Sequence, residues 1–225
     1  MSDKFYPPPA FKIEVAKQVI DRGYSVFSVA TCFDITTRSR YPWRFIVRIC
    51  SMKIQKEDLV KWEVDEPDLI ADPLLISKKI TDVEKTLLIN LPNEYKDYIH
   101  LVADQACSPL DHVDNFIARY NEKNRMAVMA TLSSTNSVVT STKLLQESIY
   151  DHRSLLPDGL IAIGSDYDDD GDAYIIYDVR TDSPTYKNVF HWRYYVDNLV
   201  VGDGLGLLAL SLREFLHKPA PEDEL

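Results

Sequence analysis

The chain has 225 residues, of which 45% are hydrophobic and 27% charged, so we expect a globular protein with one large domain or one domain plus an appendage. The formal net charge of −10 disfavours direct binding of nucleic acid, because an acidic surface repels the phosphate backbone. No apolar stretch approaches the roughly 18 residues of a membrane span, and the N-terminus lacks the apolar region of a signal peptide, so we expect a cytoplasmic protein.

The first 75 residues predict a small α+β extension made of a helix and a hairpin. Phe11, Val15 and Val19 recur at helical spacing within residues 11–21, and Gly23 follows as a stop. Residues 24–33 and 43–54 are rich in β-branched and aromatic side chains, which favours two strands. Acidic, proline-containing joints at residues 66–73 predict one domain at 1–75 and a second at 76–225. Two alternatives stay open: the N-terminal residues form a separate domain, or they add strands to the sheet of the second domain.

Residues 77–150 predict a mostly helical region. Apolar positions within residues 80–88, 95–102 and 110–117 repeat at helical spacing, and Leu91-Pro92 separates the first two segments. A short strand is expected at 126–132. A further helix is expected at 144–150, after the polar run at 133–142.

The last third of the chain changes to a β pattern. Apolar and aromatic runs predict strands at residues 160–163, 173–179 and 185–196. Six of the seven glycines lie after residue 158, which favours tight turns between these strands. A loop at 202–206 and a helix at 207–217, ended by Pro219, complete the prediction.

The excess negative charge lies in the same third. From Asp151 onward there are 15 acidic and 6 basic residues, a net charge of −9, whereas the first 150 residues carry a net charge of −1. Such an acidic surface attracts a basic partner and speeds the encounter with it. We therefore expect this part of the chain to recognise another protein.

The residues from Asp166 to Asp172 include five aspartates, spaced like the first half of an EF-hand loop. The match then fails, because Tyr177 stands where a bidentate glutamate is needed. An acidic hairpin turn is the structural alternative. Since clustered carboxylates repel one another, we interpret the run as a partner-binding patch without a metal or cofactor. The patch comprises Asp166, Asp168, Asp169, Asp170 and Asp172, with Tyr167 and Tyr195 as further candidates.

Two other patterns in the sequence resemble sites of chemistry. Cys107 and His112 can be drawn as a nucleophile and base, but no orienting residue or oxyanion hole accompanies them in the sequence. The GxGxG spacing at residues 202–206 hints at a phosphate cradle, yet it contains Asp203 and no lysine or arginine. Structural roles are the better interpretation of both, and the sequence predicts no catalytic residue.

Five short segments, taken in order, resemble the SUKH (SMI1/KNR4) superfamily. They are LPNEYKDYI at 91–99, LPDGLIAIG at 156–164, GDAYIIYD at 171–178, VFHW at 189–192 and ALSLREFL at 209–216. Each is degenerate alone, so the specificity lies in their order, which covers residues 77–218. The Asn-Gly pair that usually follows the first segment is missing here, and residues 1–70 lie outside the family pattern.

This resemblance implies an α+β fold in which a curved, mostly antiparallel sheet carries helices packed on one side. It also implies a non-enzymatic role. Bacterial members are often immunity proteins that bind and neutralise a cognate toxin, commonly a nuclease, and an acidic patch suits a basic active-site groove. The alternative is a regulatory adaptor of the same fold, like the fungal members, that binds cellular proteins without a toxin partner.

Overall fold

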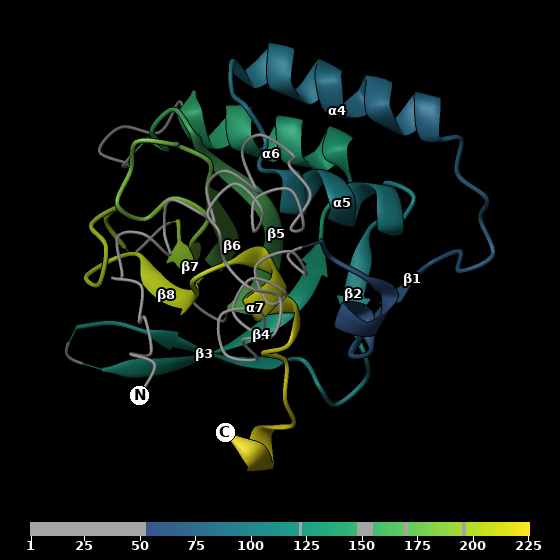
Figure 1. The fold of residues 1–225 in the computed structure, drawn as a ribbon. Helices are drawn as coiled ribbons and strands as arrows, with labels where there is room; N and C mark the ends of the chain where they lie inside the picture. Colours follow the sequence, from purple (N-terminus) through teal and green to yellow (C-terminus); the bar gives the residue numbers. More distant parts are fainter. Residues whose placement is uncertain (1–52, 122, 148–154, 169–170, 195–196) are drawn as a thin grey trace, which may run out of the picture. The chain divides into compact units, whose positions relative to one another are not determined.

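A computed structural model describes residues 53–121, 123–147, 155–168, 171–194 and 197–225 (Figure 1). The helices and 3-10 turns in this part are η1 (Lys56–Leu59), α4 (Pro73–Leu87), α5 (Asn93–Leu101), α6 (Thr135–Gln146), α7 (Leu212–Leu216) and η2 (Glu222–Glu224). The strands are β1 (Trp62–Val64), β2 (Cys107–Pro109), β3 (Asn115–Arg119), β4 (Asn124–Leu132), β5 (Leu160–Asp168), β6 (Gly171–Asp178), β7 (Val189–Arg193) and β8 (Gly206–Ala209).

The described strands form one curved sheet. Its order is β1-β2-β4-β3-β8-β7-β6-β5, and every pairing between these strands is antiparallel. An additional pairing of β4 with β5, through Met129 and Asp166, closes six of the strands into a ring. This confirms the predicted α+β class with a curved antiparallel sheet, and the curvature goes as far as closure.

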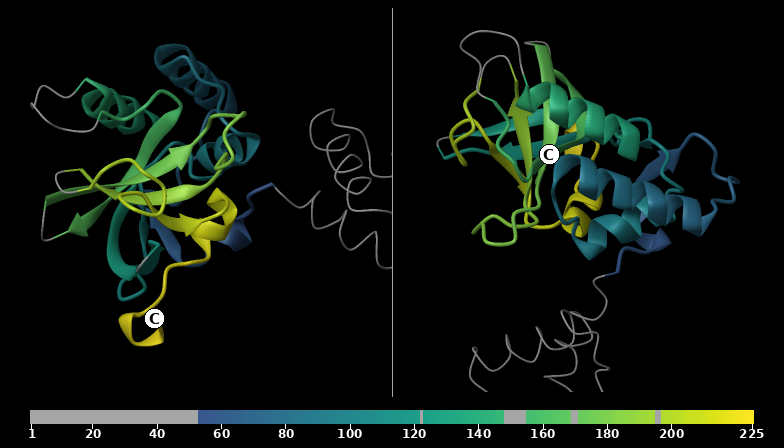
Figure 2. Two further views of the ribbon diagram at one scale, coloured as in Figure 1. Left: turned by 90° about the vertical axis from the view of Figure 1, so that its left-hand side faces the viewer. Right: turned by 90° about the horizontal axis from the view of Figure 1, so that it is seen from above.

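The helices cover the sheet from two places. In Figures 1 and 2, α4, α5 and α6 lie together on one side of the sheet, while α7 lies beside β8 and η1. Helix α4 shows how the sequence builds this layer: the Asp72 side chain caps its N-terminus, Pro73 occupies its first turn, and Leu88 ends it in a left-handed conformation. Ile76, Ile80, Val83 and Leu87 form the buried stripe of α4.

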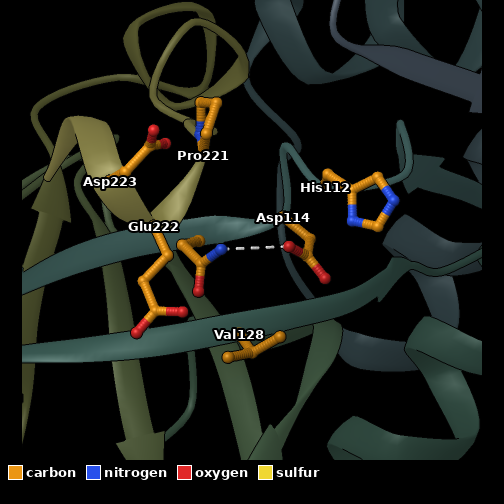
Figure 3. A pocket seen from close by; sticks show the side chains of 7 residues that line it. His112, Asp114, Val128, Pro221, Glu222 and Asp223 are labelled. Carbon is orange, nitrogen blue, oxygen red and sulfur yellow. Dashed lines mark hydrogen bonds between the residues drawn. The ribbon is translucent and has the colours of Figure 1, made fainter.

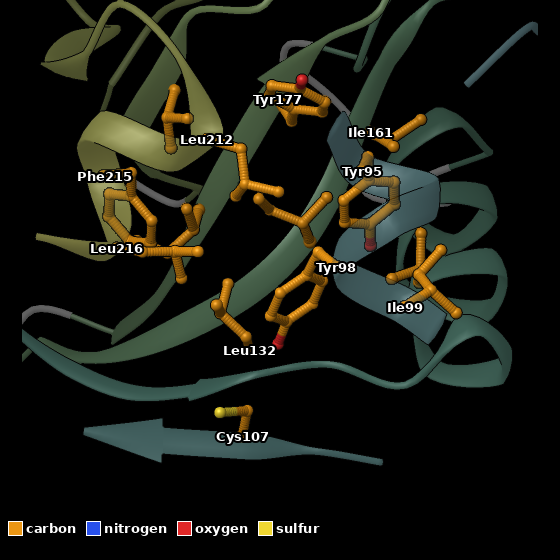
Figure 4. Packing of buried hydrophobic residues seen from close by; sticks show 14 of the residues in the cluster. Tyr95, Tyr98, Ile99, Cys107, Leu132, Ile161, Tyr177, Leu212, Phe215 and Leu216 are labelled. Carbon is orange, nitrogen blue, oxygen red and sulfur yellow. The ribbon is translucent and has the colours of Figure 1, made fainter. Parts of the chain in front are cut away.

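Two apolar clusters pack on the two faces of β5, β6 and β7. The larger joins the helices to the sheet and contains stacked Tyr95 and Tyr98 together with Phe215 (Figure 4). The smaller contains Phe190 and Trp192 on the opposite face. Because these strands are buried on both faces, they appear in the sequence as continuous apolar runs rather than alternating ones.

Three predicted elements are wrong. Residues 110–117 form a turn and the start of β3, not a helix, because Phe116 pairs with Ala127 across the β3–β4 hairpin. Residues 207–217 begin as β8 and become helical only at Leu212. The helix predicted at 144–150 begins earlier, because α6 spans Thr135–Gln146 and so takes in most of the polar run at 133–142. The buried Thr142 hydroxyl of this helix accepts a hydrogen bond from the Ala162 N–H.

Residues 54–225 form one compact unit, which includes β1 at the edge of the sheet. The indole N–H of Trp62 in β1 donates to the Leu216 carbonyl at 2.8 Å. The predicted helix at 11–21 and almost all of the predicted hairpin at 24–54 lie outside the described residues, so the domain boundary at residue 75 stays a prediction. Among the described helices, none combines the length and apolar character needed to cross a membrane.

Candidate functional site

The aspartate run lies at the end of the β5–β6 hairpin. The register pairs Tyr167 with Asp172 and Asp168 with Gly171, so the chain reverses between these two strands. Since a strand and not a helix follows the run, an EF-hand is ruled out. The structure describes only the backbone at Tyr167, Asp168 and Asp172, while Asp169, Asp170 and Tyr195 lie outside the described residues.

Asp166 lies in surroundings that the sequence did not suggest. Its side chain is 1% exposed, and its Oδ2 atom lies 2.5 Å from Nε2 of His191, whose side chain is fully buried. The other carboxylate oxygen, Oδ1, is buried and has no hydrogen-bond partner among the residues that the structure describes. In this structure Asp166 is therefore part of the interior and does not contribute to an exposed acidic patch.

The buried pair continues into a chain of three side chains. The hydroxyl of Tyr120 lies 3.0 Å from Nδ1 of His191, so the imidazole is held between a phenol and a carboxylate. Burial, and then the charge of Asp197, raise the pKa of Tyr120 to about 12. Tyr120 thus stays protonated at neutral pH. Asp166 on β5 and Tyr120, which follows β3, meet His191 on β7 here, although they lie 25 and 71 positions from it in the sequence.

A hollow of about 460 Å³, which we call the hairpin-end hollow, lies beside this chain. It is lined by Tyr120, Asn121, Lys123, Arg125, Arg193, Asp197, Gly202 and Asp203. Arg193 donates to both carboxylate oxygens of Asp197, at 2.9 and 2.7 Å. Because Arg193 pairs with Ala173, the residue after Asp172, the hollow lies near the end of the β5–β6 hairpin that carries the aspartate run. Sequence reasoning missed this mixture of basic and acidic side chains, since it emerges only from strand register.

The glycines near the hollow serve close packing. A Cβ atom on Gly206 would lie 2.4 Å from the ring of Tyr120, and one on Gly204 would lie 1.9 Å from the Asn198 carbonyl oxygen. Gly202 has φ +82° and accepts a hydrogen bond from the Asn121 N–H at 2.7 Å. These contacts support the turn interpretation of the GxGxG spacing.

A second, shallow hollow of about 790 Å³ lies beside the C-terminal residues (Figure 3). Asp114, Glu222 and Asp223 give it an acidic lining, and His112 stands at its edge. Ala220 holds the tail here through two backbone hydrogen bonds with Asn115, of 3.2 and 3.0 Å. These two backbone hydrogen bonds anchor the C-terminal tail beside the hollow. The anchoring brings Glu222 and Asp223 close to Asp114.

The structure also separates the two residues drawn as a nucleophile pair. Cys107 is buried, and burial raises the pKa of its thiol to about 12. His112 is exposed at the C-terminal hollow. Within the described part of the chain, no three His, Cys, Asp or Glu side chains are grouped as a metal site would require.

Comparison with known proteins connects this fold to one family. Residues 77–218 match the family model described as the SMI1/KNR4 family (SUKH-1). A 43-residue stretch is 63% identical to the putative transposase YkgN of Escherichia coli (strain K12), and it covers 19% of this chain and 38% of that protein. No solved structure matches the chain.

Proposed function

Because the chain belongs to the SMI1/KNR4 family (SUKH-1), we propose that it is an immunity protein that binds a cognate protein toxin and thereby neutralises it. The family match covers residues 77–218, which include the β5–β6 hairpin, the Tyr120–His191 contact and most of the acidic last third. The proposal assigns no catalytic residue to the chain. Inhibition would come from covering the toxin's working surface.

The observation that carries the proposal is the concentration of charge. Fifteen acidic and six basic residues follow residue 150, and four aspartates lie within residues 168–172. The pairing of Asp168 with Gly171 between β5 and β6 supports a location of this aspartate run at one hairpin end. A negative patch of this kind accelerates association with a basic surface and raises the dependence of the rate on salt.

The favoured partner is a toxin with a basic active-site groove, such as a nuclease. We assign the contact surface to Asp168, Asp169, Asp170 and Asp172, with Tyr167 and Tyr195 as aromatic contacts. Asp166 is left out of the surface because its carboxylate is occupied with His191 inside the fold.

The test compares two variants that change the net charge equally. D168N/D169N/D170N removes three charges from the hairpin, and E222Q/D223N/E224Q removes three from the C-terminal tail. Association with a toxin-like protein encoded by an adjacent gene is measured at low and high salt. The hairpin variant should associate at least about tenfold more slowly at low salt, and the tail variant within about twofold of the parent.

Equal rates for the parent and the hairpin variant would overturn the assignment of the surface. The adaptor alternative would be favoured by two results together: no protein encoded by an adjacent gene binds the chain, and the chain captures a defined cellular protein. Inhibition of the toxin in the same mixture separates an immunity protein from an adaptor that merely binds.

A further inference from the structure

The connector between β1 and α4 lies at the outer edge of the described fold (Figure 1), and it exposes large apolar side chains. Ile70 is 95% exposed and Leu74 is 80% exposed, and Leu69 and Leu75 beside them are about half exposed. We call the exposed side chains of residues 63–75 the connector surface. Contiguous exposed apolar side chains with a charged rim commonly mark a site of protein interaction.

The helix that follows does not need these residues for its own packing. The buried stripe of α4 begins at Ile76, and at 100° per residue Leu74 projects roughly 160° away from it. Ala71 packs against the core from within the connector, which leaves its neighbour Ile70 directed away from the core. The side chains of Ile70 and Leu74 are thus exposed in the folded connector and helix, and the packing of α4 does not use them.

The connector has a defined shape. The backbone N–H of Glu66 donates to the side chain of Gln105 at 2.8 Å, and the same amide side chain donates back to the Glu66 carbonyl at 3.0 Å. Leu69 closes a turn onto the Glu66 carbonyl, and the Asp72 side chain caps α4. Because these bonds preorganise the loop, binding there costs little conformational entropy.

The negative charge of the connector surface favours a partner with basic side chains. Five acidic residues and no basic one lie between Lys61 and Lys78: Glu63, Asp65, Glu66, Asp68 and Asp72. Within the described part of the chain, no ion pair involves the side chains of Asp65, Glu66 or Asp68. Apolar side chains rimmed by unpaired carboxylates complement a segment that presents apolar residues between lysines or arginines.

We propose that the connector surface is a second docking site, distinct from the aspartate hairpin, and that it binds a cationic amphipathic segment of another protein. The apolar residues of that segment would cover Leu69, Ile70 and Leu74, and its basic residues would meet the carboxylates on the rim. This inference does not depend on the immunity role, because it rests on a different surface.

The probe is an 18-residue amphipathic peptide made of leucine and lysine, added to the ¹⁵N-labelled full chain. Saturable amide shift changes should centre on residues 66–75. L69S/I70S/L74S should weaken binding at least about tenfold, whereas L88S/L144S/L210S, which changes equally exposed leucines elsewhere, should stay within about twofold. D65N/E66Q/D68N should reduce the dependence of the affinity on salt.

Three results would overturn the proposal. The first is an equal effect of the two leucine variants. The second is a shift pattern centred on the aspartate hairpin, which would leave the connector without a role. The third is a dimer of the unbound chain in sedimentation equilibrium that L69S/I70S/L74S dissociates, since a second copy would then be the occupant of the surface.

Discussion

The hydroxyl of Tyr177 on β6 donates a hydrogen bond of 2.6 Å to the carboxylate of Glu94 on α5. The same carboxylate oxygen accepts the backbone N–H of Leu212 at the start of α7, at 3.4 Å. Burial, and then the charge of Glu94, raise the pKa of Tyr177 well above its ordinary value, so the phenol remains a donor at neutral pH. One buried carboxylate thereby joins two helices and the sheet.

Replacing Tyr177 by phenylalanine should lower the free energy of unfolding by about 1–3 kcal/mol, because Glu94 loses its shortest hydrogen bond inside the core. Urea unfolding followed by tryptophan fluorescence measures this. Tyr98→Phe is the matched control, since within the described residues the equally buried hydroxyl of Tyr98 has no hydrogen-bond partner stronger than the Cys107 thiol. The control should change stability by less than about 0.5 kcal/mol; similar losses in both variants would contradict the role of Glu94.

Replacing His191 by alanine should cost about 3–5 kcal/mol, because it leaves the Asp166 carboxylate buried with no described partner. The double variant D166A/H191A should be less destabilised than the sum of the two single variants, since the two side chains act as a pair. Unfolding of the parent, the two single variants and the double variant gives the coupling energy. Additive losses of stability would show that the pair is not coupled. The control is His100→Ala on the exposed face of α5, whose stability should stay within about 0.5 kcal/mol of that of the parent.

Asp178→Asn should destabilise the protein by about 2–4 kcal/mol at pH 7. Burial alone would raise the pKa of Asp178, but hydrogen bonds from Arg180, Thr185 and Ser183 outweigh it and hold the pKa below its ordinary value of 3.8. The stability from this carboxylate is therefore present above pH 3.8 and lost as pH falls through the lower folded-state pKa.

The measurement for Asp178 is urea unfolding of the parent and the variant between pH 7 and pH 2.5. The difference in stability should be constant above about pH 5 and shrink below the unfolded-state pKa. Asp111→Asn, at an exposed position, should show no such difference. A gap that widens on acidification would have the wrong sign for a carboxyl group with a lowered pKa.

Gly206→Ala should cost about 1–3 kcal/mol, because the new methyl group would lie 2.4 Å from the ring of Tyr120. The hydroxyl of Tyr120 contacts the imidazole of His191, so a displacement of the ring also disturbs that hydrogen bond. In a Tyr120→Ala background the same substitution should cost less than half as much, since the obstacle is gone. An undiminished cost in that background would place the strain in the backbone rather than at Tyr120.

Local pattern was sufficient where an element is stabilised by its own neighbours in the chain. Helix α4 was predicted from its apolar stripe, and the break at Leu91-Pro92 predicted the start of α5. Strands β4 and β6 also lie close to where they were expected, and β5 begins at the predicted Leu160 but continues to Asp168, beyond the predicted end at residue 163. Local pattern failed at β3 and β8, because the packing of their apolar side chains involves residues far away in the sequence: Phe116, for example, packs against Trp62 and Phe215.

The sequence by itself determined the α+β class, the order of the family segments and the concentration of acidic residues after residue 150. These depend on residue types and on spacing along the chain. Only the tertiary structure decided that Asp166 turns inward to His191 while the run that follows it continues to the hairpin end. The physical reason is that backbone hydrogen bonds between strands set the register that brings distant side chains together. Almost every residue type offers the same backbone donor and acceptor, so residue types along the chain do not reveal which strands pair.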